Sequence, residues 1–215
     1  MRRLAAVFLI FALALPVQAA QERQYVALTL EGGPYGEVTG ILLDGLYDRG
    51  IHATFLLQGS RMEDSPEIVQ RMFQEGHEIG CNGYSGNAMT AMSRRQIAQE
   101  LMDTQALLPQ GCQLCFFWPM GGISSDAIRQ VAEARKLAFL SWSAEGKNVQ
   151  AVQDGDILRL RADSITGAYQ ALAVIDALSE RGYRLVSVQE LVKIRRAKIT
   201  PGKTYTCFPA AGSAR

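Results

Sequence analysis

A short apolar run that ends in a glycine-rich turn is the feature that most constrains the fold. Residues 25–30 (Tyr-Val-Ala-Leu-Thr-Leu) are mostly apolar and β-prone, which is typical of a buried parallel strand. Glu31 and a Gly-Gly-Pro turn at 32–34 follow, and an amphipathic helix pattern then continues to Gly50. In open and barrelled α/β folds, residues just past the carboxyl end of a strand face the ligand site, so we expect Glu31 there.

The same alternation of strand and helix patterns continues along the chain. Further strands are expected at 52–57, 78–81, 115–118, 137–142, 157–160 and 182–186. Helix caps are expected at Ser65, at Ser93 in a capping box with Gln96, and at Ser124 or Ser125. Strands and helices joined by short links indicate a parallel sheet or barrel with helices outside, and about seven such units suit an incomplete α/β barrel.

Composition narrows the function. The 215 residues carry 22 basic and 21 acidic side chains, and this near-neutral balance argues against nucleic acid or a polybasic membrane contact. His52 and His77 are the two histidines of the chain, which limits the imidazoles available as metal ligands or general bases. We expect His52, at the start of a strand, to lie at or near the surface.

The first 19 residues have the pattern of an export signal. Arg2 and Arg3 precede an apolar run at 4–15, and Pro-Val-Gln-Ala at 16–19 suits cleavage. The run is short for a bilayer span, although an uncleaved membrane anchor is the alternative. We therefore expect a secreted or cell-envelope protein with a signal peptide at 1–19, a domain at 20–194 and a peripheral tail at 195–215.

Four cysteines bear on the redox chemistry. They are Cys81, Cys112, Cys115 and Cys207. In an exported protein an even number permits two disulfides, and the sequence leaves all three pairings open. The pair Cys112 and Cys115 has redox-motif spacing but lacks a thioredoxin-like βαβ start, and a four-cysteine zinc site would need a second close pair.

Several landmarks together resemble the polysaccharide deacetylases, also called the NodB-homology family or family 4 carbohydrate esterases. They are Val-Ala-Leu-Thr-Leu-Glu-Gly-Gly-Pro at 26–34, Gly-Ile-His-Ala-Thr-Phe at 50–55, Glu-Gly-His-Glu-Ile-Gly at 75–80 and the segment 181–191. The resemblance implies a distorted (β/α)7 barrel that removes acetyl groups from N-acetylated glycans. It also implies a divalent metal such as zinc, which polarises the amide carbonyl and activates a water. The histidine that matches His77 is structural in the family, so the resemblance implies a structural role for His77.

The resemblance assigns roles that this sequence does not fill. In the family, an Asp and two His hold the metal, a second Asp is the base, and a further His is the acid. Glu31 takes the base position, but Gly32 replaces the metal-binding Asp. Asn82 and Gly86 replace the two ligand histidines, and Arg161 replaces the acid. We therefore expect no metal and no confident catalytic residue, with Glu31 as a weak candidate.

Candidate ligand contacts lie at the expected strand ends. Trp118 and Trp142 end two strands, where they either pack at the barrel mouth or offer a stacking platform for a sugar ring. Asn82 and Tyr84 would add polar contacts. Glu31 would contact the ligand or simply accept backbone amides of its own turn.

Three functions remain open from the sequence. The first is an exported, catalytically inactive member of the family that binds a glycan, such as peptidoglycan or a chitin-like oligosaccharide, or an envelope protein. The alternative is an active hydrolase of carbon–nitrogen bonds in an N-acetylated glycan, with Glu31 acting and Asn82 as oxyanion donor. The third is a structural protein that is cross-linked by disulfides between its cysteines.

Overall fold

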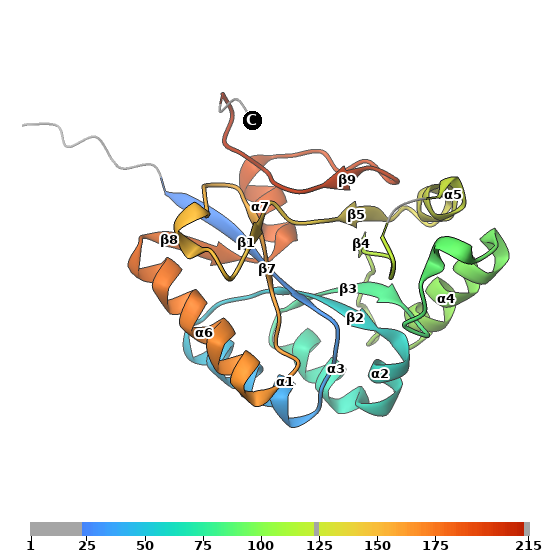
Figure 1. Cartoon of the computed structure of the whole chain (residues 1–215), viewed down its shortest axis with the longest axis horizontal. Coiled ribbons are helices and arrows are strands. Elements are labelled where there is room, and N and C mark those ends of the chain that lie inside the picture. The colour runs from blue at the N-terminus through green and yellow to red at the C-terminus, as the bar shows by residue number, and fades with distance from the viewer. Residues whose placement is uncertain (1–22, 123–124, 213–215) are drawn as a thin grey trace, which may run out of the picture.

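A curved parallel sheet with helices packed around it forms the body of the protein (Figure 1). The computed structural model describes residues 23–122 and 125–212. Within them, the strand order is β6-β7-β1-β2-β3-β4-β5-β9, and β8 also pairs with β1. All of these strand pairs are parallel. The protein is therefore an α/β protein with a curled, open sheet, and the distorted (β/α)7 barrel expected from the sequence is confirmed.

The strands are short except at the centre of the sheet. Their bounds are β1 (Gln24–Glu31), β2 (Thr54–Gln58), β3 (Glu78–Gly83), β4 (Phe116–Phe117), β5 (Ala138–Leu140), β6 (Ala144–Glu145), β7 (Ile157–Leu160), β8 (Tyr183–Val186) and β9 (Thr204–Tyr205). The central strand β1 pairs with β2, β7 and β8, and its residues 26–30 are all buried. Burial on both faces explains the nearly continuous apolar run in its sequence.

Helices follow most strands, as the sequence predicts. Their bounds are α1 (Glu37–Asp48), α2 (Gly59–Asp64), α3 (Pro66–Gln74), α4 (Arg94–Ala106), α5 (Asp126–Ala134), α6 (Ile165–Glu180) and α7 (Val188–Arg195), with 3-10 turns at Met89–Ala91 and Val149–Ala151. No helix in the described part of the chain is long and apolar enough to cross a membrane. The expected signal peptide at 1–19 lies outside the described residues.

The predicted helix caps are largely confirmed. Ser93 and Gln96 form the reciprocal capping box at the start of α4, and Ser125 accepts a hydrogen bond from the backbone of Ile128 in α5. Ser65 precedes α3, but its side chain makes no capping hydrogen bond. The alternative cap Ser124 lies outside the described residues. Serine at these positions satisfies amide groups that the first helical turn leaves unpaired.

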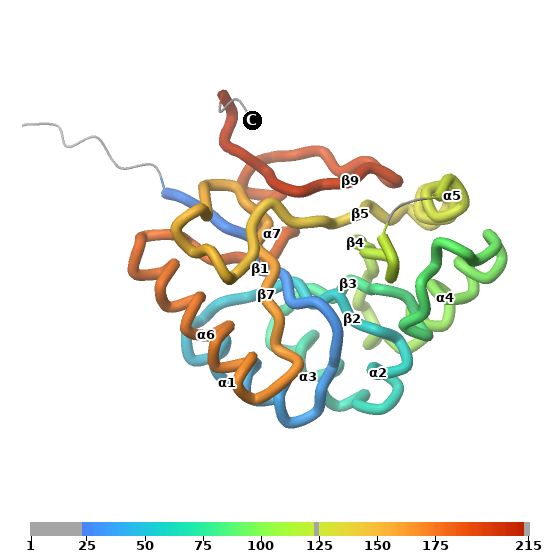
Figure 2. Tube along the Cα trace, viewed as in Figure 1, coloured from blue at the N-terminus to red at the C-terminus, as the bar shows by residue number. Residues whose placement is uncertain are grey.

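The segment after α7 differs from the prediction of a peripheral tail. Within it, β9 pairs with β5, and Phe208 is buried with its amide donating to the carbonyl of Gly155 at 2.7 Å. Figure 2 shows this last segment running beside β5. The prediction is wrong because the two-residue strand β9 and one buried aromatic are too short a signal to stand out in a polar, proline-containing sequence.

The polar segment 143–154 and the four cysteines are two further features of the fold. The polar segment contains the short strand β6, which extends the sheet beyond β7. All four cysteines carry free thiols, so the structure shows neither of the two disulfides that the sequence permits. Cys81 is fully buried and packs with Ile97 and Leu101 of α4, on the helix-facing side that its place in the strand predicts.

Candidate functional site

A cleft of about 270 Å³ opens at the carboxyl ends of β1, β2, β3 and β7. This is the end of a parallel sheet at which α/β proteins place their ligands. The cleft is lined by Glu31, Gly32, Tyr35, Gln58, Arg61, Asn82, Met120, Arg161 and Asp163. Two of the five residues singled out from the sequence, Glu31 and Asn82, therefore line it.

Glu31 is held by an arginine from the neighbouring strand. The Nη1 group of Arg159 donates to Oε2 of Glu31 at 3.1 Å, and the Nη2 group of Arg159 donates to Glu145. The guanidinium carbon also lies 3.8 Å from the ring centre of Trp142. The Glu31 and Arg159 side chains are only 17% and 16% exposed, so their attraction is less screened than that of a surface pair. The carboxylate thus has a cationic partner in place of the backbone amides considered from the sequence.

The turn after Glu31 leaves no room for a side chain at position 32. Gly32 has a φ of +85°, and a Cβ atom built on it would lie 2.6 Å from the hydroxyl oxygen of Tyr35. Residues other than glycine rarely adopt this backbone conformation, and the tyrosine hydroxyl fills the adjacent space. Tyr35 is itself covered by Arg61, whose guanidinium lies 4.6 Å from the ring centre.

A neighbouring side chain also occupies the space beside Gly86. Its φ is +76°, and a Cβ atom there would lie 2.7 Å from the side-chain nitrogen of Gln58. The side chain of Gln58 lines the cleft and also donates to Ser60 at 2.8 Å. Glutamine thus fills the space next to the second position at which the family resemblance places an imidazole.

Asn82 carries an unused hydrogen-bond acceptor in the cleft. The residue is 1% exposed, and its Oδ1 atom has no hydrogen-bond partner among the described residues. Its Nδ2 group makes a weak contact of 3.8 Å with the sulfur of Met120. Leaving a buried acceptor unpaired costs about 1–3 kcal/mol, so a ligand that donates a hydrogen bond here would recover that cost.

Tyr84 lies outside the residues that line the cleft. Its hydroxyl donates to Glu63, while its amide donates to the carboxylate of Glu100 at 2.7 Å. The hydrogen bond to Glu63 raises the pKa of the Tyr84 hydroxyl, which stays protonated at neutral pH. The structure thus directs Tyr84 toward α2 and does not bring it together with Asn82.

The two tryptophans pack against each other. The ring centres of Trp118 and Trp142 are 4.8 Å apart, and both are half-buried beside a core cluster that includes Phe116 and Val188. One face of Trp142 is covered by Arg159. This arrangement matches the packing alternative considered for them, and neither ring lines the cleft.

Both histidines precede a strand, His52 before β2 and His77 before β3, so they lie at the opposite end of the sheet from the cleft. His77 is buried, and its Nδ1 atom accepts a hydrogen bond from the amide of Ala53 at 3.2 Å. Burial lowers the pKa of His77 to about 4, so the ring is neutral at pH 7. His52 is exposed and contacts Glu190 at 3.1 Å. The structural placement of His77 and the surface placement of His52 are confirmed.

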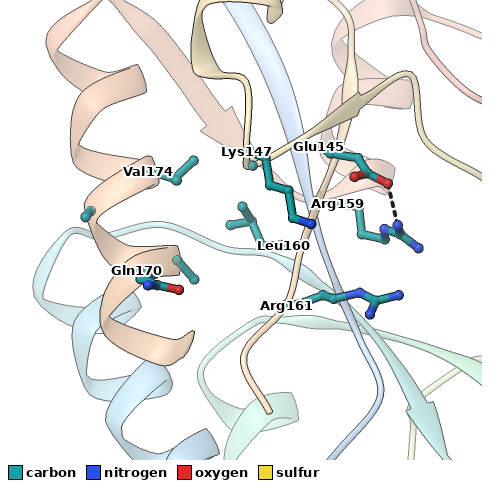
Figure 3. Close-up of a pocket in the computed structure, with 10 residues that line it drawn as sticks. Glu145, Lys147, Arg159, Leu160, Arg161, Gln170 and Val174 are labelled. Atoms are coloured by element: carbon teal, nitrogen blue, oxygen red, sulfur yellow. Dashed lines mark hydrogen bonds and ion pairs between the residues drawn. The ribbon is translucent and has the colours of Figure 1, made fainter. Parts of the chain in front are cut away.

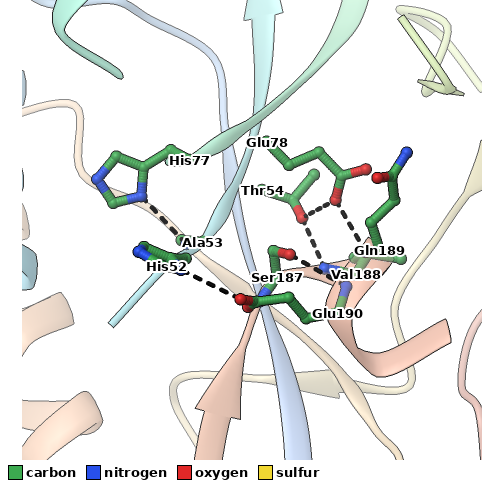
Figure 4. Close-up of polar contacts among 9 residues, drawn as sticks. All are labelled: His52, Ala53, Thr54, His77, Glu78, Ser187, Val188, Gln189 and Glu190. Atoms are coloured by element: carbon green, nitrogen blue, oxygen red, sulfur yellow. Dashed lines mark hydrogen bonds and ion pairs between the residues drawn. The ribbon is translucent and has the colours of Figure 1, made fainter. Parts of the chain in front are cut away.

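A buried carboxyl lies next to these histidines. Oε2 of Glu78 accepts hydrogen bonds from the hydroxyl of Thr54 at 2.6 Å and from the amide of Gln189 at 3.1 Å (Figure 4). Burial raises the pKa of Glu78 to about 7, despite these two hydrogen bonds. The group joins β2, β3 and α7 at the amino ends of the strands, which is a structural position.

The side chains of the cleft do not fit the three-ligand metal site that the resemblance implies. Zinc sites of this kind need three imidazole, thiolate or carboxylate ligands, whereas the corresponding positions hold Gly32, Asn82 and Gly86. The nearby carboxylate of Glu31 is bonded to Arg159. Within residues 23–122 and 125–212, no group of three or more His, Cys, Asp or Glu side chains is placed to hold a metal ion.

Sequence reasoning missed Arg159, which pairs with Glu31, and also Tyr35 and Gln58, which line the cleft. Arg159 is the one charged residue in the otherwise apolar strand Ile-Leu-Arg-Leu, and this charge could have marked it as a candidate. In the structure it is aligned with Thr29 of β1. Tyr35 and Gln58 follow β1 and end β2, so their place after a strand could have suggested them. In the structure, Tyr35 occupies the space beside Gly32, and Gln58 occupies the space beside Gly86. The sequence alone does not show that these residues lie together.

Comparison with known proteins supplies the family. The sequence profile for "Polysaccharide deacetylase" matches residues 18–139, more than half of the chain. The chain is 27% identical over 192 residues to peptidoglycan-N-acetylmuramic acid deacetylase PdaC of Bacillus subtilis, an alignment that covers 82% of this chain and 40% of PdaC. The chain thus spans about two-fifths of the length of the first curated relatives it matches.

Solved structures agree with this assignment. A family 4 acetyl xylan esterase from Clostridium thermocellum, in complex with a cobalt ion, superposes with a TM-score of 0.77 at 26% identity, covering 86% of this chain and all of that one. A mutant of a CE4 family pseudoenzyme with restored enzymatic activity has a TM-score of 0.71 at 18% identity, covering 86% and 70%, which shows the fold alone. From its sequence match and its fold together, this chain belongs to the polysaccharide deacetylase family.

Proposed function

We propose that this protein is a catalytically inactive member of its family that binds a glycan in the cleft above Glu31. The observation that carries the proposal is that non-catalytic side chains occupy the space beside positions where the family resemblance places metal ligands. The hydroxyl of Tyr35 and the amide of Gln58 fill the spaces beside Gly32 and Gly86, and Arg159 neutralises Glu31. A cleft of about 270 Å³ is present at the site, while the groups that would cleave an amide are missing from its lining.

Amide hydrolysis makes demands that this lining does not meet. The reaction needs a stabilised oxyanion, an activated water and an acid for the leaving amine. Removing one oxyanion donor alone costs about 3–4 kcal/mol of transition-state stabilisation. The lining of the cleft contains no histidine, and of its two carboxylates, Glu31 and Asp163, Glu31 is paired with the guanidinium of Arg159. We therefore propose that the protein works without a metal and without turnover.

Glycan binding is supported by the chemistry of the same cleft. Asn82 offers an unpaired acceptor, Asp163 adds a carboxylate, and Tyr35 adds an aromatic ring. Sugars present hydroxyl and acetamido donors, together with apolar ring faces, and such a mixed lining suits them. PdaC is by name a peptidoglycan deacetylase, so peptidoglycan fragments are the first ligands to test, followed by chitin-like oligosaccharides.

Export belongs to the same proposal. The basic start and apolar run at 1–19 have the pattern of a signal peptide, and a protein that binds peptidoglycan must reach the envelope. Expression of the full chain with its signal, followed by N-terminal sequencing of the envelope and culture fractions, tests this. A mature protein that begins near residue 20 is the expected result, and a full-length cytoplasmic protein contradicts it.

The central experiment measures turnover and binding on one preparation. Purified protein is incubated with peptidoglycan fragments and chitin oligomers, with zinc, cobalt or manganese supplied, and acetate release is compared with a blank. Calorimetry with the same sugars measures affinity. We expect binding without acetate release, weakened by Asp163→Ala and unchanged by Glu180→Ala, which removes an exposed acid on α6.

Two outcomes would contradict the proposal. Acetate release that Glu31→Gln abolishes would show an active hydrolase of carbon–nitrogen bonds, which is the alternative function. Absence of binding to every glycan tested would remove the ligand class and leave an envelope-protein partner to be sought. Elemental analysis of the purified protein adds a separate measurement, and we expect no stoichiometric metal.

A further inference from the structure

A second cavity of about 550 Å³ lies beside the cleft, between β6, β7 and α6 (Figure 3). Its lining consists of Glu145, Gly146, Lys147, Arg159, Leu160, Arg161, Gln170, Ala171, Ala173 and Val174. Arg161 lines both this cavity and the cleft above Glu31. A ligand seated in the cleft could therefore extend one substituent past Arg161 into the second cavity.

The cavity has an excess of positive charge. Its lining holds the three cations Lys147, Arg159 and Arg161 against one carboxylate, Glu145. Arg159 is already bonded to Glu145 and Glu31. Lys147 and Arg161 form no ion pair with any described residue, and both are exposed. Two cations thus remain available to an anion, while the acids Glu31 and Asp163 line the adjoining cleft.

The wall of the cavity across from Lys147 is formed by apolar side chains, most of them small. Ala171, Ala173 and Val174 of α6 face the cavity, and Leu160 closes it from β7. Figure 3 shows the ammonium end of Lys147 extending toward the strand that carries Leu160, with Gln170 and Val174 on the helix across the cavity. A cation beside an aliphatic wall suits a carboxylate attached to a short apolar group better than it suits a neutral sugar ring.

We infer that this cavity binds the carboxylate of an acidic glycan, with Lys147 and Arg161 as the residues that recognise the anion. The ligand is a sugar that carries its carboxylate on a short apolar arm, as a lactyl ether does, and the apolar arm lies against Leu160 and Val174. This inference rests on the proposed glycan binding and adds a preference for charged over neutral sugars. It concerns recognition alone and requires no chemical step.

The test compares ligands that differ only in charge. Calorimetry measures the affinity of the full chain for the disaccharide of N-acetylglucosamine and N-acetylmuramic acid, for the methyl ester of its lactyl group, and for diacetylchitobiose. We expect the free acid to bind about fivefold tighter than the ester at low salt, since a partly exposed charge pair contributes up to about a factor of five. The difference is expected to shrink at high ionic strength.

Matched variants locate the effect. Lys147→Gln is expected to weaken binding of the acid and to leave binding of the ester unchanged. Arg161→Gln also alters the cleft, so it is expected to weaken binding of both ligands, and binding of the acid more than that of the ester. Lys198→Gln, which removes an exposed cation after α7, is the control and is expected to change neither. Equal affinity for acid and ester would overturn the anion site while leaving glycan binding intact.

Failure of all three sugars to bind would count against the proposed function, and a second measurement then decides the anion site. NMR titration of the labelled full chain with lactate reports directly on the amides around Lys147 and Arg161 and on the side chain of Gln170. Shifts at these residues that methyl lactate does not produce support the site. Their absence overturns it.

Discussion

The guanidinium of Arg159 lies 3.1 Å from the carboxylate of Glu31, and it joins two adjacent parallel strands where the cleft opens. The same group bonds Glu145 of β6 and covers the ring of Trp142. One arginine therefore connects β1, β6 and β7 with the aromatic pair. Arg159 therefore holds these strands together beside the cleft and also pairs with the carboxylate of Glu31.

Arg159→Met is expected to destabilise the protein by about 2 kcal/mol, because it leaves the partly buried carboxylate of Glu31 without a partner. Urea unfolding, followed by circular dichroism, measures the change. Arg184→Met is the matched control, since Arg184 is an exposed arginine on β8 with no ion pair to a described residue, and we expect a change within about 0.5 kcal/mol. Equal effects of the two variants would show that the Arg159 contacts contribute nothing.

Gly32→Ala is expected to cost about 2 kcal/mol or more, because the new methyl group combines a strained backbone with a 2.6 Å approach to Tyr35. Tyr35→Phe removes the contacting oxygen, so the double variant should recover part of the cost. Thermal unfolding of the two single variants and the double variant gives the coupling energy between the positions.

Gly40→Ala provides the control for that series. Gly40 lies inside α1, where a Cβ atom would meet nothing within 4 Å, so we expect the alanine to stabilise the protein by about 0.5–1 kcal/mol. A destabilisation by Gly32→Ala that is unchanged in the Tyr35→Phe background would mean that backbone strain alone determines the cost.

Glu78 and His77 are expected to give opposite dependences of stability on pH. The pKa of Glu78 rises from 4.5 to about 7 on folding, so the folded state binds more protons and stability falls as pH rises through that window. The pKa of His77 falls from 6.5 to about 4, so stability rises with pH between these values. The two slopes oppose each other between about pH 4.5 and 6.5.

Glu78→Gln tests this balance. The variant removes the falling contribution, so its stability should rise more steeply with pH than that of the unsubstituted protein, by up to about 1.4 kcal/mol per pH unit. Urea unfolding at a series of pH values measures both curves. Parallel curves for the two proteins would contradict the raised pKa of Glu78.

Phe208→Ala is expected to destabilise the protein by about 3 kcal/mol, because the ring is 5% exposed and stacks on Tyr205 at a distance of 5.3 Å between ring centres. Tyr47→Ala is the control, since Tyr47 is an exposed aromatic on α1 and its loss should have little effect. Chemical unfolding compares the two. A negligible effect of Phe208→Ala would restore the prediction of a peripheral tail.

The elements with long periodic patterns could be predicted from the sequence, and those formed by isolated residues could not. The buried run of β1 and the Ser93 capping box each repeat a signal over several positions, so they were found. Strands β6 and β9 have two residues each, which is too few for a pattern. Their formation depends on partner strands that are distant in sequence.

The residues of the cleft can likewise be divided into those that the sequence predicts and those that it does not. Glu31 and Asn82 could be placed from the sequence because both lie at the carboxyl end of a strand, β1 and β3 respectively. Tyr84 was misplaced because it lies just beyond β3, and its direction is set by hydrogen bonds to Glu63 and Glu100 rather than by strand alternation. The pairing of Trp142 with Arg159 depends on tertiary packing that neither local sequence specifies.

The bond between the Phe208 amide and the Gly155 carbonyl, together with the pairing of β9 and β5, also affects when folding can finish. During synthesis, the strands of the centre emerge first, but the edge formed by β5 and the start of β7 stay uncovered until residue 208 has left the ribosome. A nascent chain therefore cannot complete this edge of the sheet until its last segment is available to pair with β5.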